Sequence, residues 1–254
     1  MTDLEVISSR YLFAMARFSP VMLVPALTPF GWVPITVRTL LLLVVTALAV
    51  GGTRVAPIAF NAEDPMAFAC SLFGEAALGL TLSLAVVLPA AALAFSARLV
   101  DIQSGVGSAS LFNPALKANE SLAGTAMQWA GMMIFFALGL HVLLIRGLTA
   151  SIELVPLGSG NFLISPGRFF DMLSSQFLLG MVVVAPVILG LFAVDLAVAY
   201  MSRSLPQANV YFVSLPLKVA AGFVLLAFTL RFAPVLIERL YRDAFSSVPA
   251  FSGA

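Results

Sequence analysis

Long apolar runs alternate with short polar segments along the chain, and this alternation predicts a series of helices. The runs cover residues 11–30, 35–50, 66–100, 122–145, 169–201 and 210–230. A helix rises about 1.5 Å per residue, so about 20 apolar residues cross a bilayer core of about 30 Å. Most of these runs reach or approach that length. We therefore expect an all-α, membrane-associated protein built from helical hairpins.

Prolines inside these runs predict that several helices are kinked or broken. Pro20, Pro25 and Pro29 lie in the first run, which argues against one straight helix and favours a loop around residues 28–34. The run at 66–100 is too long for one perpendicular span and contains Pro89. It forms either one long kinked helix or a helical hairpin. Pro65, directly before it, suits the first position of a helix.

A polar, glycine- and serine-rich segment, residues 101–121, interrupts the apolar pattern in the middle of the chain. Gly105 and Gly107 can adopt backbone angles closed to other residues. Pro114 cannot continue a helix and pushes Asn113 towards an extended conformation. We expect a loop between two helices, and unstructured connections of this length are usually functional or disordered.

Composition places the chain outside the soluble globular class. Hydrophobic residues make up 61% and charged residues 10% of the 254 residues, and the mean hydropathy is +1.07. A soluble domain is about half apolar and a quarter charged, so this surface must face lipid or protein partners. The net charge of +1 argues against binding of nucleic acid. The single cysteine, Cys70, excludes an intrachain disulfide, and we expect one domain over residues 1–254.

Charged residues nevertheless occur inside the apolar runs, where each costs about 3 kcal/mol on insertion scales. Arg17, Arg38 and Arg146 lie near run ends, where snorkelling to an interface is common. Glu75 could instead pair with an arginine inside the bundle. An ion pair could also form across a hairpin between Asp195 and Lys218, which flank the polar segment 202–209. Basic residues are spread over successive connections and predict no orientation, which favours polar positions buried against other subunits.

The sequence contains no recognisable catalytic constellation. The GxSxG, HExxH and phosphate-loop patterns are all missing from it. His141 is the only histidine and has no cysteine or carboxylate cluster near it in sequence, which disfavours a metal role. We expect neither catalysis nor a cofactor. One alternative is a secondary transporter that uses Asp195 and Lys218 in broken transmembrane helices.

Several motifs, in a fixed order along the chain, carry a resemblance to a known family. They follow Arg17, Pro20 and Pro25 and read VPITVR (33–38), GEAALGLTLSL (74–84), LVDIQSGVGSASLFNPA (99–115), GLHVLLIRGLTASIELVPLG (139–158) and RSLPQANVYFVSLPLK (203–218). In this order and spacing the chain resembles the FliR/SctT family of flagellar and type III secretion export-gate proteins. Asn113 stands where the family often has Asp, and Tyr211 where Phe is commoner. Asp101, Asp195 and Lys218 favour the injectisome branch over the flagellar one.

The resemblance implies a location, partners and a mechanism. Such a protein lies in the basal body at the bacterial inner membrane, and its fold is similar to a fusion of its two partners' folds. It assembles with FliP/SctR-type and FliQ/SctS-type subunits into a channel for unfolded polypeptides. An FlhB/SctU-type switch protein wraps the base of that channel.

The resemblance also implies roles for particular residues. The loop at 105–121 would help to plug the pore, with Leu111 and Phe112 as the bulky sealing residues, while 101–105 would end a packed helix. The plug residues would be Gly105, Gly107, Leu111, Phe112, Asn113 and Pro114. The subunit-contact or structural polar positions would be Arg17, Glu75, Asp101, Gln103, Asp195, Arg203, Pro206, Gln207, Asn209 and Lys218.

Overall fold

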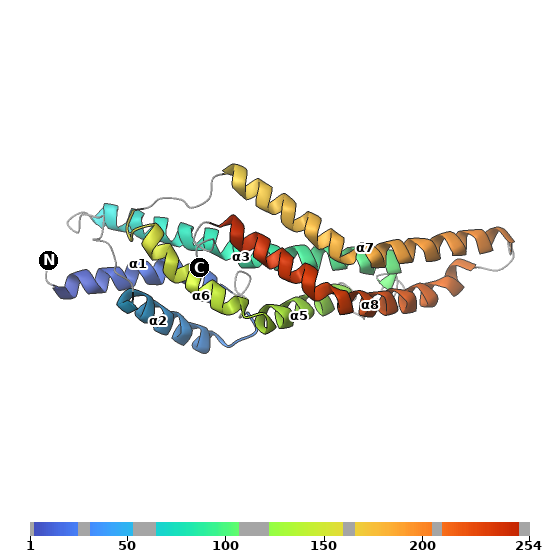
Figure 1. Cartoon of the computed structure of the whole chain (residues 1–254), viewed down its shortest axis with the longest axis horizontal. Coiled ribbons are helices and arrows are strands. Elements are labelled where there is room, and N and C mark those ends of the chain that lie inside the picture. The colour runs from blue at the N-terminus through green and yellow to red at the C-terminus, as the bar shows by residue number, and fades with distance from the viewer. Residues whose placement is uncertain are drawn as a thin grey trace. The chain divides into compact units, whose positions relative to one another are not determined.

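Helices are the only regular secondary structure in the described part of the chain, as expected. The computed structural model describes residues 3–24, 31–52, 65–106, 122–159, 166–204 and 210–248. Within these ranges the helices are α1 (Asp3–Leu23), α2 (Ile35–Gly52), α3 (Pro65–Ser104), α5 (Leu122–Ala137), α6 (Leu140–Leu154), α7 (Pro166–Ser204) and α8 (Val210–Ser247) (Figure 1). No strand occurs in these ranges. The all-α prediction is therefore confirmed.

Four of these helices are long and apolar enough to cross a membrane: α2, α3, α7 and α8. Taken together, α5 and α6 also pass this test as one broken span. The protein is thus a membrane protein by the length and composition of its helices.

The helix boundaries decide several of the expectations from the sequence. α3 begins at Pro65 and runs through Pro89, so the long run is one helix and not a hairpin. The run at 122–145 forms two helices, α5 and the start of α6. It breaks at Leu138 and Gly139, and Gly139 has a left-handed backbone with φ +70°.

Pro20 lies inside α1 and is accommodated by a local hydrogen bond. Proline has no N–H, so the Ala16 carbonyl one turn earlier loses its helical donor. The Ser19 hydroxyl donates to that carbonyl at 2.9 Å. α1 therefore continues to Leu23. Of the loop expected around residues 28–34, residues 28–30 lie outside the described ranges, and residues 31–34 are non-helical.

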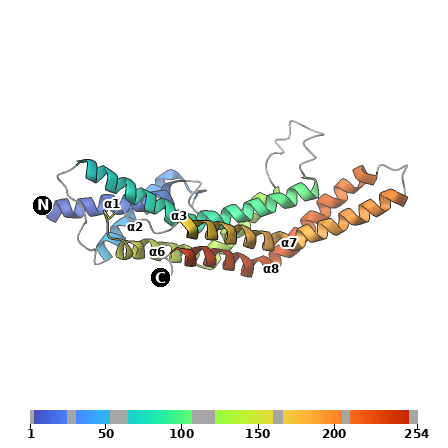
Figure 2. The ribbon, with the colours of Figure 1, turned by 90° about the horizontal axis from the view of Figure 1, so that it is seen from above.

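The chain divides into two compact units, which we describe separately. Unit 1 comprises Met1–Leu88, Leu138–Leu173 and Tyr241–Ala254. In it α1 and α2 lie side by side in both views (Figures 1 and 2). Its fully buried side chains include Phe13 and Phe18 of α1, Leu78 and Leu82 of α3, and Leu144 and Leu148 of α6. These residues form its core.

Unit 2 comprises Pro89–Ala137 and Ser174–Leu240. Its parts of α7 and α8 run side by side as a hairpin (Figures 1 and 2). Glycines let its helices approach closely. A Cβ added at Gly190 of α7 would lie 2.6 Å from Leu225 Cδ1 of α8, and one at Gly180 of α7 would lie 2.9 Å from the Ala92 carbonyl oxygen of α3. That both units form one domain stays a prediction.

Candidate functional site

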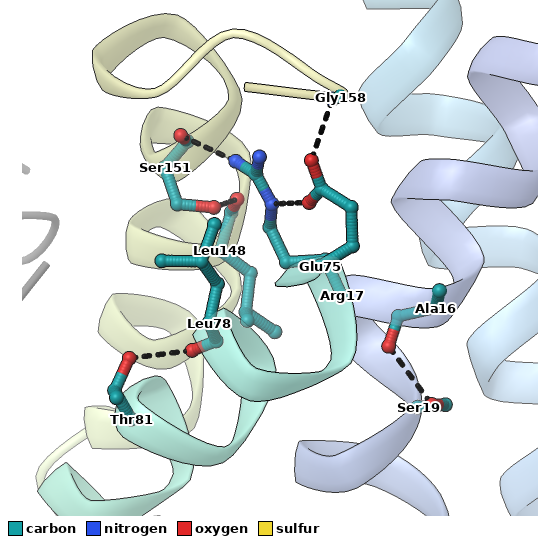
Figure 3. A network of polar contacts seen from close by, with 9 residues as sticks. All are labelled: Ala16, Arg17, Ser19, Glu75, Leu78, Thr81, Leu148, Ser151 and Gly158. Atoms are coloured by element: carbon teal, nitrogen blue, oxygen red, sulfur yellow. Dashed lines mark hydrogen bonds and ion pairs between the residues drawn. The ribbon is translucent and has the colours of Figure 1, made fainter. Parts of the chain in front are cut away.

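A fully buried ion pair connects α1 to α3 in unit 1. Arg17 Nε donates to Glu75 Oε2 at 2.5 Å, and both side chains are 0% exposed. Arg17 Nη1 also donates to the Ser151 carbonyl of α6 at 2.7 Å, and Glu75 Oε1 accepts the Gly158 N–H at 2.7 Å (Figure 3). The pair therefore joins three helices and the turn that follows α6.

Two backbone features shape this network. Gly158 has φ +85°, a conformation that side chains rarely adopt, and this orients its N–H towards Glu75. The Ser151 carbonyl also accepts the Val155 N–H at 3.0 Å, which ends α6. Arg17 Nη2 is buried and has no hydrogen-bond partner among the described residues. The network is thus nearly, but not fully, satisfied.

The arginines near the run ends behave differently from one another. The prediction that Arg17 snorkels to an interface is wrong, because its side chain is fully buried. The expected pairing of Glu75 with an arginine is confirmed. Snorkelling is also wrong for Arg38, which is buried and donates from Nη1 to the Leu23 carbonyl at 2.8 Å. Arg146 is exposed on α6.

Asp101 connects the end of α3 to the start of α5 in unit 2. Its two carboxylate oxygens accept the Ala123 N–H at 3.0 and 3.1 Å, and Asp101 is 7% exposed. Ser104 Oγ donates to the Asp101 carbonyl at 3.1 Å, and Gly105, with φ +79°, donates its N–H to the Ile102 carbonyl at 3.2 Å. The expectation that 101–105 closes a packed helix is confirmed.

α8 covers this junction from one side. A small pocket there is lined by residues of the junction and of α8, namely Val100, Asp101, Ser104, Val106, Ala123, Val219, Gly222, Phe223 and Leu226. A Cβ added at Gly222 would lie 3.1 Å from Ser104 Cβ. The last turn of α3 therefore rests closely against α8.

The second predicted ion pair is also present. Lys218 Nζ of α8 lies 2.5 Å from Asp195 Oδ1 of α7, with side chains 15% and 38% exposed. The pair spans the α7–α8 hairpin of unit 2, as its positions beside the polar segment 202–209 predicted.

Replacing Lys218 with methionine is expected to lower the stability by about 1 kcal/mol, because a partly exposed pair contributes modestly. Asp195 would keep its charge on an otherwise apolar hairpin. The measurement is the thermal midpoint of the purified complex in detergent. The exchange Asp195→Lys/Lys218→Asp restores the pair and should recover most of the loss. A double variant no better than Lys218→Met would show that pairing is not the cause.

The remaining predicted positions are only partly described. Gln103 is half-buried near the end of α3, and Arg203 is exposed in the last turn of α7. The other predicted positions lie outside the described residues: Gly107, Leu111, Phe112, Asn113, Pro114, Pro206, Gln207 and Asn209. Sequence reasoning missed Ser151, Gly158 and Ala123, which act through their backbone groups. Only Gly158, a glycine in the turn that follows α6, carried a signal.

In the described ranges, no three His, Cys, Asp or Glu side chains gather closely enough to hold a metal ion. What the arrangement does provide is mechanical. The Arg17–Glu75 and Asp195–Lys218 ion pairs each join two helices, while large apolar side chains remain exposed. Fold and polar network together define an all-α membrane protein whose internal charges serve to join its helices.

Comparison with known proteins identifies the family. The model of bacterial export proteins, family 1, matches residues 8–244. The chain belongs to this family, which is the FliR/SctT family of export-apparatus proteins.

Curated relatives come from both branches of the family. The flagellar biosynthetic protein FliR of Aquifex aeolicus is 27% identical over 214 residues, covering 84% of this chain and 82% of that protein. FliR of Bacillus subtilis is 28% identical, covering 66% and 67%. The Yop proteins translocation protein T of Yersinia pestis is 30% identical, covering 60% and 59%. Assignment to the injectisome branch therefore stays a prediction.

Proposed function

We propose that this chain is a non-enzymatic subunit of a type III protein export gate in the bacterial inner membrane. With FliP/SctR-type and FliQ/SctS-type subunits it forms the channel through which unfolded polypeptides are secreted, and an FlhB/SctU-type protein binds the base. Membership of the export family supports this function. The observation that carries the assembly is the apolar surface that the chain leaves exposed.

That surface is extensive on the α7–α8 hairpin of unit 2. Five of its large side chains are between 57% and 74% exposed: Leu196, Tyr200, Phe228, Phe232 and Val235. Exposed apolar surface of this extent marks an interface with proteins or membranes. The nearby charges of Asp195 and Lys218 satisfy each other, so we prefer export over the transporter alternative, which rested on these two residues.

We also propose that residues 105–121 help to plug the channel, with Leu111 and Phe112 sealing it. Two observations support this role. The family resemblance implies a plug role for this segment, and the described residues on either side are held together by the hydrogen bond between Asp101 and Ala123. The described ends of the segment are thus joined to each other, as a plug loop would require.

Replacing residues 107–121 by a short Gly-Ser linker tests the plug proposal and the gate-assembly proposal. The Asp101–Ala123 junction stays in place, so we expect the variant to co-purify with its partner subunits as the full chain does. Cells or vesicles that contain the assembled variant should become leaky to small ions, because the sealing residues are gone. Ion flux and co-purification yield are the measurements.

Two outcomes would contradict these proposals separately. An assembled variant complex that is as ion-tight as the full-length complex would exclude the plug. Purification of the full-length chain as a stable, monodisperse monomer, without affinity for the partner subunits, would exclude the gate assembly.

A further inference from the structure

Asp101 caps the N-terminus of α5, a role that usually falls to the residue directly before a helix. The first four N–H groups of a helix lack partners within it. Commonly the Ser, Thr, Asp or Asn directly before the helix accepts one of them. Here the Ala123 N–H, in the first turn of α5, is bound by a carboxylate 22 residues earlier, at the end of another helix.

The electrostatics of this contact favour a carboxylate. The N-terminus of a helix carries a partial positive charge, so a negative group there is stabilising. Asp101 is 7% exposed, which limits screening of the interaction by water and salt. Both carboxylate oxygens face the same N–H, at 3.0 and 3.1 Å.

The residues around Asp101 fix its position. Ser104 Oγ binds the Asp101 carbonyl, and the left-handed Gly105 ends α3 one residue later. Gly222 of α8 packs against Ser104, since a Cβ added at Gly222 would lie 3.1 Å from Ser104 Cβ. The last turn of α3, which carries the carboxylate, is therefore fixed by its own hydrogen bonds on one side and by α8 on the other.

We propose that Asp101 is a positioning residue that fixes the start of α5 to the end of α3, the two described ends that flank residues 107–121. Its backbone belongs to the helix that the segment leaves, and its side chain holds the helix to which the segment returns. Without the carboxylate, the start of α5 is released from the end of α3. The consequence for ion permeability rests on the proposed plug function, whereas the anchor itself does not.

Two substitutions separate the anchor from general packing. Asp101→Leu keeps a similar volume but removes both acceptor oxygens. Asp101→Asn keeps one acceptor oxygen and should retain most of the anchoring. Ala123→Pro removes the N–H from the other side, and proline is tolerated in the first turn of a helix. Asp171→Leu, at an exposed position on α7, is the matched control.

The direct measurement is a distance distribution by pulsed electron paramagnetic resonance in the assembled complex. Spin labels at Ile102→Cys and Met133→Cys, both exposed, report on α3 and α5 in a Cys70→Ser background. We expect one narrow distance distribution for the spin-labelled protein with Asp101 unchanged. We expect the same for Asp101→Asn and Asp171→Leu. Asp101→Leu and Ala123→Pro should give a broadened or shifted one. A narrow, unshifted distribution in both, or failure to recover either complex, would overturn the anchor.

Ion flux through the same complexes tests the functional consequence. We expect a several-fold higher leak for Asp101→Leu and Ala123→Pro, and a near wild-type flux for Asp101→Asn. A leak after replacement of residues 107–121, but none in the two anchor variants, would overturn this consequence and leave the plug function standing. No leak after replacement of the segment would overturn the plug function, while the distance distributions still decide the anchor.

Discussion

Replacing Glu75 with glutamine is expected to lower the free energy of unfolding by about 3–5 kcal/mol, the usual effect of removing one partner of a buried pair. The new side chain keeps its shape and an oxygen that can accept the Gly158 N–H. It removes the negative charge opposite Arg17, whose guanidinium is fully buried and bound to Glu75 Oε2. Water cannot reach that charge, so the desolvation penalty stays uncompensated. Arg17→Met should act in the same direction, since it leaves the Glu75 carboxylate buried.

The measurement is the thermal midpoint of the purified complex in detergent, together with the yield of the complex. For a chain of this size the expected loss corresponds to a drop of roughly 6–20 °C. Two exposed positions on α6 provide matched controls: Glu153→Gln and Arg146→Met change the same charges at the surface. Both should stay within about 0.5 kcal/mol of the wild type.

The double variant Arg17→Met/Glu75→Gln separates charge from packing. It removes both charges while Glu75→Gln retains the contact with Gly158, and replacing a buried pair by neutral groups is often close to neutral. We therefore expect recovery of most of the loss. If the double variant were as unstable as the worse single variant, the uncompensated charge would not be the cause.

The pattern of apolar runs predicted most of the fold, because helices in a membrane protein need long apolar stretches. It failed at Leu138 and Gly139, where the run stays apolar although the helix ends. A single glycine in an apolar run is compatible with either outcome, and the left-handed backbone of Gly139 decides it.

The polar contacts were predictable only when their partners were close in sequence. Asp195 and Lys218 flank one hairpin, so their pairing followed from the topology. Glu75 had several arginines to choose from, and Arg17, 58 residues away, was expected at an interface instead. Such a pair depends on which helices lie side by side in space, and a single sequence does not contain that information.

Backbone partners were largely beyond sequence reasoning. Gly158 and Ala123 contribute N–H groups that every residue except proline possesses. Asp101 was expected at the end of a packed helix, and that position is confirmed. Its carboxylate serves α5 because the chain returns to the same point after residues 107–121, which only the tertiary structure shows.

Gly79→Ala is the second substitution with a large expected effect. The added Cβ would overlap the Arg17 carbonyl oxygen and lie 2.9 Å from Pro20 Cδ. Both atoms belong to the backbone or a rigid ring of α1, so α1 and α3 must move apart. Overpacking of this kind costs about 1–3 kcal/mol. The gain of about 1 kcal/mol in helix propensity offsets only part of a cost at the upper end of that range.

Gly51→Ala is the control, because nothing lies within 4 Å of the Cβ it would add to α2. It should leave the thermal midpoint unchanged or raise it slightly, whereas Gly79→Ala lowers it. Equal midpoints for the two variants would show that α1 and α3 are not in close contact at Gly79.

The clash at Gly79 should also be coupled to the buried ion pair. Glu75 lies one helical turn before Gly79 on α3, and the clashing oxygen belongs to Arg17 itself. Displacing that backbone moves the guanidinium away from Glu75, so part of the cost of Gly79→Ala is electrostatic. Gly79→Ala should therefore cost less in the Arg17→Met/Glu75→Gln background than in the wild type, by at least 0.5 kcal/mol as for contacting residues generally. Strict additivity of the thermal midpoints would assign the whole effect to packing between α1 and α3.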